Sequence, residues 1–196
     1  NNVAYVLDGK NKAYKERSSV SNDYNYECYY WTNIPAVCLL SVNGELYFGT
    51  EDGRICKFNT DKEHDKYNDD GEPIVASWAT KNDDDDAPHL YKSMTKKGCL
   101  VTLKPYRRSS GTIYVMKDGN PRQYLRNGLM DILDWNDVDF DRFTFNTNEN
   151  PQDIFFKKKV KKYKRLQIIV ENDGLNEGFG ILQIVKTFTV GNYAKK

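Results

Sequence analysis

Two tight-turn signals, close together in residues 38–58, constrain the fold of this chain more than any other feature. The segment reads CLLSVNGELYFGTEDGRICKF, in which Asn43-Gly44 and Asp52-Gly53 separate three short apolar runs. Such pairs indicate β-hairpins, because the central residues of the favoured turn need positive φ angles. We therefore predict a three-stranded antiparallel meander. Its predicted inward-facing side chains are Leu46, Phe48, Ile55 and Phe58.

The composition favours strands in the rest of the chain as well. Aromatic residues make up 13% of the 196 residues and include 14 tyrosines, and aromatic side chains are enriched in sheets. Hydrophobic residues make up only 39%, and the mean hydropathy is −0.77, so we expect a thin core. We predict an all-β fold, with a propeller-blade-like meander region in residues 1–82 and a jelly-roll-like β-sandwich domain in residues 83–196.

Individual strands are predicted where short apolar runs end at Gly, Pro, Asn or Asp. In the N-terminal region these are residues 3–8, 24–31 and 73–80, with polar loops at 10–23 and 59–71. In the C-terminal region they are residues 99–103, 111–116, 142–146, 166–170 and 180–188. Residues 117–120 predict a hairpin turn, and residues 125–133 predict one short helical turn that Gly128 weakens. The domain boundary is expected near residues 80–90.

Charge and hydropathy exclude some classes of protein. The net charge is +1, which argues against a dedicated nucleic-acid-binding protein, since those usually carry a basic excess. No apolar run approaches the roughly 18 residues of a membrane span, and no signal-peptide pattern opens the chain. The chain begins with Asn1 rather than Met, so we expect a fragment or processed domain of a longer protein, or a trimmed product.

The cysteines do not form a metal-binding or redox pattern. Cys28, Cys38, Cys56 and Cys99 include no C-x-x-C pair. The first three lie within predicted strands. We expect buried free thiols in a reducing compartment, with disulfides between neighbouring strands as the alternative.

Two acidic segments are weighed as metal sites. Asp83–Asp86 with His89 offers hard oxygen ligands, but four consecutive carboxylates point apart and repel, so a solvated linker is favoured. Asp137, Asp139 and Asp141 alternate with Val138 and Phe140, which would place the carboxylates on one face of a strand. These three are weak calcium candidates, and a polar outer face is favoured. We expect no cofactor.

Two further segments are weighed as partner surfaces. The basic run of residues 157–165 fits a solvated sheet edge or an acidic partner better than nucleic acid. Its candidate residues are Lys157, Lys158, Lys159, Lys161 and Lys162. Tyr24, Tyr26, Tyr29, Tyr30 and Trp31 are the residues of a possible sugar-stacking platform. Burial in a β core is favoured for them, and Tyr29, Tyr30 and Trp31 are retained as partner-binding candidates.

No catalytic constellation is recognisable. His64 and His89 are the only histidines, and both lie in acidic polar loops. Hydrolase, metalloprotease, phosphate-loop and dinucleotide motifs are missing from the sequence. We expect a protein that is not an enzyme, although two carboxylates of a glycan-cleaving enzyme would meet only in the fold.

At this point the residues resemble a family. Trp31–Pro35, followed by NGELYFGTEDGRICKF, is similar to a motif in virion structural proteins of tailed bacteriophages, in the class with a propeller-like part and a C-terminal β-sandwich. The likeness continues over most of the chain, at residues 70–74, 77–78, 88–93, 112–115, 165–172, 177–181 and 189–191.

The resemblance implies an assembly role in a phage or prophage tail or head–tail connector, with other virion proteins or copies of the chain as partners. It carries over no catalytic residues. It also implies a virion protein that is made in the bacterial cytoplasm. The alternative is a carbohydrate-binding or host-receptor-binding β-sandwich module, which would use the aromatic stretch and the Asp137/Asp139/Asp141 face. We expect no membrane partner.

Overall fold

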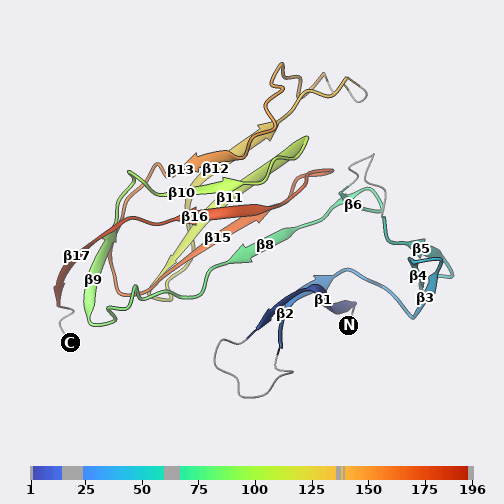
Figure 1. Ribbon diagram of the computed structural model, residues 1–196, viewed down its shortest axis with the longest axis horizontal. Coiled ribbons are helices and arrows are strands. Elements are labelled where there is room, and N and C mark those ends of the chain that lie inside the picture. Colours follow the sequence, from blue (N-terminus) through green and yellow to red (C-terminus); the bar gives the residue numbers. More distant parts are fainter. Residues whose placement is uncertain (1, 15–23, 60–66, 136–137, 139, 194–196) are drawn as a thin grey trace. The chain divides into compact units, whose positions relative to one another are not determined.

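The chain folds into strands that belong to two compact units. The computed structural model describes residues 2–14, 24–59, 67–135, 138 and 140–193 (Figure 1). One unit comprises residues 1–60 and the other residues 61–196. The described residues contain strands and turns and no helix, so the predicted all-β class is confirmed.

The N-terminal unit contains two small antiparallel sheets. β1 (Val3–Tyr14) pairs with β2 (Tyr24–Thr32). β3 (Cys38–Val42), β4 (Glu45–Gly49) and β5 (Ile55–Lys57) form a three-stranded sheet in that order. The predicted meander is therefore confirmed, and no closed propeller is seen among the described residues of this unit. β1 continues past Asp8, where the sequence predicts a turn, because a register irregularity between Asp8 and Lys12 lets the pairing resume.

The first turn of the meander has the predicted backbone geometry. Two of the four side chains that were expected to face inward, however, are exposed. Asn43 and Gly44 have φ angles of 51° and 84°. Leu46 and Ile55 are exposed, whereas Phe48 and Phe58 are half-buried. The register explains Ile55, because Phe48 pairs with Cys56 and so Ile55 faces the opposite side. The Phe58 ring lies 5.2 Å from that of Phe48 and 5.9 Å from that of Trp31.

The C-terminal unit has one four-stranded and two three-stranded antiparallel sheets. The four-stranded sheet has the order β12 (Gln123–Asp131), β11 (Arg108–Lys117), β15 (Leu166–Asn172), β8 (Ala76–Ala79). The second has the order β13 (Gln152–Phe155), β10 (Leu100–Leu103), β16 (Ile181–Val185). The third has the order β14 (Val160–Tyr163), β9 (Leu90–Met94), β17 (Phe188–Tyr193). A short hairpin, β6 (Asn68–Asp69) and β7 (Glu72–Pro73), precedes them.

The core of this unit lies where sheets pack face to face. A Cβ on Gly111 of β11 would lie 3.2 Å from Leu103 of β10, and one on Gly128 of β12 would lie 2.1 Å from Ile154 of β13. The absence of side chains at these glycines therefore lets the sheets approach closely. The buried cluster includes Leu103, Ile113 and Val170, which are 0% exposed.

The boundary between the units lies earlier than the predicted 80–90. β8 pairs with β15, so residues 76–79 belong to the C-terminal sandwich. The β6–β7 hairpin is also attached to this unit, because Asn68 Nδ2 donates to Asn176 Oδ1 at 2.6 Å. The acidic run after β8 is therefore part of a folded unit rather than a linker.

Two further predictions about the C-terminal region are wrong, and a third is correct only in part. Residues 125–133 lie mostly in β12, because the predicted turn at Asp118 and Gly119, with φ angles of 51° and 75°, returns the chain along β11. Residues 142–146 form no strand, because side chains replace the ladder partners: Asn146 N, for example, donates to Thr144 Oγ1 at 3.0 Å. Residues 180–188 contain two strands, separated at Lys186-Thr187.

The packing of Leu103 predicts a large and site-specific loss of stability. Leu103→Ala leaves a cavity between two sheets and should lower the free energy of unfolding by about 2–5 kcal/mol. Leu182→Ala makes the same chemical change at a side chain that is 54% exposed, and it should cost no more than about 0.5 kcal/mol. Urea unfolding followed by far-UV circular dichroism measures both, and equal losses would contradict the described core.

Candidate protein-interaction surfaces

An aromatic loop extends between β12 and β13. We define the aromatic loop as residues 132–135, 138 and 140–146. Trp135 is 76% exposed, Phe140 86% and Phe145 79%. Large aromatic side chains are usually buried, so their collection on one exposed segment makes it a candidate interaction surface.

The aromatic rings contact one another rather than the core. The ring of Phe143 lies 4.8 Å from that of Phe145 in an edge-to-face arrangement and 6.4 Å from that of Phe140 in a stacked one. These contacts hold three phenyl rings as one cluster at the surface.

Polar side chains attach the aromatic loop to the sandwich. Arg142 Nη2 donates to Asp131 Oδ1 at 2.6 Å, and Arg142 Nη1 donates to Glu177 Oε1. Arg107 forms an ion pair with Asp134 at 2.7 Å. The loop therefore directs Asp134 and Arg142 toward the protein and its aromatic groups toward solvent.

The anchor for Arg142 is a buried carboxylate. The Glu177 side chain is 5% exposed, and Glu177 Oε2 accepts a hydrogen bond of 2.8 Å from Asn172 Nδ2. Burial alone would raise the pKa of Glu177, but hydrogen bonds from Ser110, Arg142 and Asn172 outweigh it and lower the pKa. Glu177 is therefore held in its charged form, in which it pairs with Arg142.

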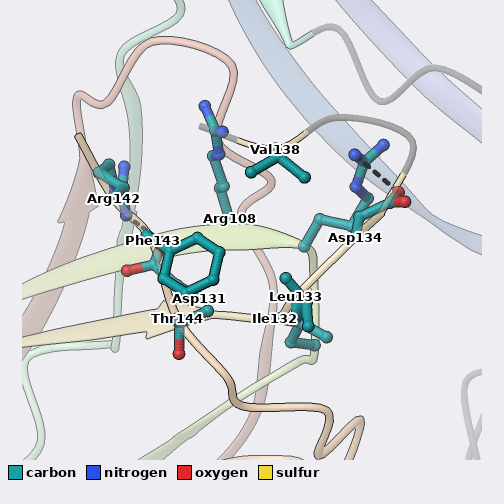
Figure 2. A pocket seen from close by; sticks show the side chains of 10 residues that line it. Arg108, Asp131, Ile132, Leu133, Asp134, Val138, Arg142, Phe143 and Thr144 are labelled. Carbon is teal, nitrogen blue, oxygen red and sulfur yellow. Dashed lines mark hydrogen bonds and ion pairs between the residues drawn. The ribbon is translucent and has the colours of Figure 1, made fainter. Parts of the chain in front are cut away.

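A small pocket lies beneath the aromatic loop (Figure 2). Its volume of ≈ 20 Å³ is room for a water molecule and not for an organic ligand. Figure 2 shows Asp134, the ion-pair partner of Arg107, at one side of the pocket and Phe143 at the other. The lining residues are Arg107, Arg108, Asp131, Ile132, Leu133, Asp134, Val138, Arg142, Phe143 and Thr144. The loop surface, rather than this pocket, is the candidate site.

The N-terminal unit exposes a second apolar surface on β3. All five residues of β3 are exposed, and Leu39 and Leu40 are 64% and 61% exposed. β3 is also at the edge of its sheet, because only β4 pairs with it among the described strands. Both faces and one edge of an apolar strand are therefore open.

The aromatic residues predicted to fill a β core lie at the surface instead. Tyr29, Tyr30 and Trp31 on β2 are all exposed, because the sheet that carries them has only two strands. The Tyr30 ring packs 5.2 Å from that of its cross-strand neighbour Tyr5. The side chains of Tyr24 and Tyr26 lie outside the described residues.

The acidic run predicted as a solvated linker is folded around two lysines. Lys186 Nζ pairs with Asp83 Oδ2 at 2.7 Å and also with Asp85. Lys92 is 0% exposed, and its Nζ donates to the backbone oxygens of Asp84 and, at 2.8 Å, Ala87. The ammonium of Lys186 lowers the pKa of Asp83. Ammonium groups therefore occupy the position that a cation would need, and His89 instead stacks on Tyr193 at 5.8 Å.

The second acidic segment is only partly described. Asp137 and Asp139 lie outside the described residues, and Asp141 is exposed in a turn. Phe140, predicted to face inward, is exposed because the segment leaves the sheet. The described part of the chain holds no cluster of three or more metal-ligating side chains.

The four cysteines are free, but only Cys99 is buried. Its Sγ accepts a hydrogen bond of 3.1 Å from the backbone N–H of Thr187. Cys28 and Cys38 are exposed and Cys56 is half-buried, so burial of these three was wrongly predicted. Their strands belong to sheets that are open to solvent, whereas Cys99 lies between packed sheets.

The predicted basic surface is on a sheet edge. Lys157, Lys158, Lys159, Lys161 and Lys162 are all exposed, and β14 is an edge strand paired only with β9 among the described strands. The aromatic loop, in contrast, is absent from the sequence predictions. The signal in the sequence is the interleaving of Phe140, Phe143 and Phe145 with polar residues, a pattern that alternation along strands explains equally well.

Comparisons with known protein families, with curated proteins and with solved structures find no match. Within the described ranges, no helix has the length and apolar character needed to cross a membrane. The fold and these surfaces together define an all-β chain that exposes apolar side chains.

The buried carboxylate predicts a pH-dependent contribution to stability. The folded-state pKa of Glu177 lies below its ordinary value of 4.5. Its charge therefore stabilises the fold above that pH, and the contribution is lost as the pH falls through the lowered pKa. Glu177→Gln should cost about 1–3 kcal/mol at neutral pH, and the difference from wild type should shrink near pH ~3. Urea unfolding at both pH values tests this. The exposed Glu149→Gln is the control, and a pH-independent loss would contradict the ionic role.

Proposed function

We propose that this chain is a non-enzymatic structural component of a tailed bacteriophage or prophage particle, in the tail or head–tail connector region. It acts through protein–protein assembly, with other virion proteins or copies of itself as partners. It is made in the bacterial cytoplasm and resides in the virion. The sequence resemblance supports the class of particle, and the exposed apolar surfaces support the mode of action.

The observation that carries this proposal is that the aromatic loop exposes its aromatic side chains, while its arginine is held against the protein. A loop that only connected two strands would bury its aromatic rings or replace them with polar residues. Here Arg142 is held by Asp131 and the buried Glu177, while Phe140 and Phe145 face solvent. Aromatic side chains held in place before binding lose little conformational entropy on association, and they commonly dominate interface energies.

β3 supports the same conclusion from the other unit. Its apolar side chains are exposed on both faces, and its free edge can hydrogen-bond to a strand of another chain. Glu45 of the adjacent strand, in contrast, is neutralised by Lys57, with 2.5 Å between Nζ and Oε1. The charged residues of the three meander strands therefore lie on β4 and β5, and β3 carries none.

The exposure of Tyr29, Tyr30 and Trp31 favours a second candidate, a carbohydrate-binding or host-receptor-binding module. Exposed aromatic rings can stack on the apolar faces of sugars. Binding of the purified chain to a glycan array tests this candidate. The same measurement is made with the Trp31→Ala variant and with calcium removed by a chelator. Binding that Trp31→Ala abolishes would support it, and absence of binding would reject it.

Immunogold electron microscopy tests the structural role. Antibody against the chain, applied to a lysate of the induced source bacterium, should label tails or the head–tail junction. Particles that stay unlabelled, both intact and disrupted, would contradict the proposal.

The aromatic loop predicts a separation of assembly from stability. Phe140→Ser/Phe145→Ser removes two exposed rings and should leave the free energy of unfolding within about 1 kcal/mol of wild type. It should nevertheless reduce incorporation into particles at least about tenfold, because interface aromatic residues often contribute more than 2 kcal/mol. Quantitative immunoblotting of purified particles measures incorporation. Tyr193→Ser, a control at a 73% exposed ring on β17, should be incorporated normally, and equal incorporation of all variants would exclude the loop.

A further inference from the structure

Residues 157–165 contain six lysines and an arginine, on a backbone that buried side chains hold in place. We define the lysine strip as Lys157, Lys158, Lys159, Lys161 and Lys162. Phe156, Val160 and Tyr163 alternate with these lysines and are 3%, 4% and 0% exposed. Phe156 N donates to Cys99 O at 3.0 Å, and Val160 and Tyr163 pair with β9. The backbone that carries the lysines is thus fixed by the core.

A bulge adds one lysine to the exposed side of the strip. Regular alternation would point Lys161 and Lys162 to opposite faces. Lys162 instead has a φ angle of 52°, and the register shifts between Val160 and Tyr163. Both lysines are therefore exposed while Val160 and Tyr163 are both buried.

The positive charges of the strip are not neutralised within the described chain. None of its five lysines forms an ion pair with a described carboxylate. Asp118, the nearby acid, accepts instead from the backbone N–H groups of Lys164 and Arg165, both at 2.8 Å. Lys117 Nζ donates to Lys161 O at 2.9 Å and adds another cation beside the strip. Elsewhere in this unit, Arg122 and Lys186 are paired with carboxylates.

The strip's position favours an acidic polypeptide over nucleic acid. β14 is an edge strand, so one side of its backbone lacks a strand partner among the described residues. An extended peptide can pair with such an edge, and lysines there repel basic strands while attracting acidic ones. Single-stranded nucleic acid would need open rings for base stacking. The neighbouring rings of Tyr124 and Tyr91 each already carry a lysine over the ring, since the Nζ atoms of Lys158 and Lys164 lie 5.1 and 5.8 Å from the ring centres.

We infer that the lysine strip is a docking site for an acidic, extended segment of a neighbouring protein chain. Carboxylates of that segment pair with the exposed ammonium groups, and the interaction is strongest at low salt. This inference rests on the proposed assembly function and names the chemistry of one partner. It concerns a surface separate from the aromatic loop.

Fluorescence anisotropy with a labelled peptide tests the inference directly. The probe is a peptide of alternating Glu and Ser, about 12 residues long, which places its carboxylates on one face when extended. The purified full chain should bind it, and affinity should fall steeply when the salt rises from about 0.05 to about 0.5 M. Lys161→Gln/Lys162→Asn should bind about fivefold more weakly, because each exposed charge pair contributes modestly. Asn is used at 162 because it tolerates positive φ.

Lys57→Gln/Lys104→Gln is the matched control. It removes the same two charges outside the strip and should bind as wild type does, and urea midpoints confirm that both variants fold. Absence of binding by wild type, or equal weakening in both variants, would overturn the inference. Tighter binding of a single-stranded deoxythymidine oligonucleotide of equal charge would also overturn it and reassign the surface to nucleic acid. If antibody labels the particles but the chain does not bind the peptide, only the acidic partner is rejected. If the chain binds the peptide but the particles stay unlabelled, only the virion role is rejected.

Discussion

The contact between the inner faces of β10, β11 and β15 is the interaction on which the C-terminal unit depends. Leu103, Ile113 and Val170 are completely buried there, and Gly111 permits the close approach of the two sheets. The described residues of the N-terminal unit contribute nothing to this buried cluster. Since burial of apolar area is the main favourable term in folding, the two units differ in how much of their own stability they can supply.

Around that core, buried ion pairs fix the segments that the sheets do not hold. Lys186 binds the carboxylates of Asp83 and Asp85, and Tyr163 donates to Asp85 Oδ2 at 3.2 Å. Glu177 and Arg142 do the same for the aromatic loop. Removal of Arg142 or Lys186 is costly because it leaves the buried carboxylate of Glu177 or Asp85, 5% and 4% exposed, without its cation. The acidic and aromatic segments are consequently parts of the folded unit, although the sequence predicts a solvated linker for the first and strand alternation for the second.

Local turn chemistry could be predicted from the sequence, and exposure could not. Asn43-Gly44 and Asp118-Gly119 were placed correctly because positive φ angles restrict which residues fit. Ile55 was placed on the wrong face because its orientation depends on the register of β5 with β4. The length of the turn between the two strands sets that register. The aromatic loop was missed for a related reason. Alternation of apolar and polar residues predicts a strand, but only the neighbouring strands decide whether its apolar face is covered.

The open apolar edge of β3 also bears on when the protein must meet its partner. A strand with free backbone groups and no charged residue pairs with any similar strand it encounters, including another copy of itself. Under the proposed assembly function, productive assembly and aggregation would compete for residues 37–42 from the moment the meander forms. Aggregation rises more steeply with concentration than binding to a partner that is already present does. On that proposal, the ratio of this chain to its partner during synthesis would determine the yield, and β3 would be the element through which that ratio acts.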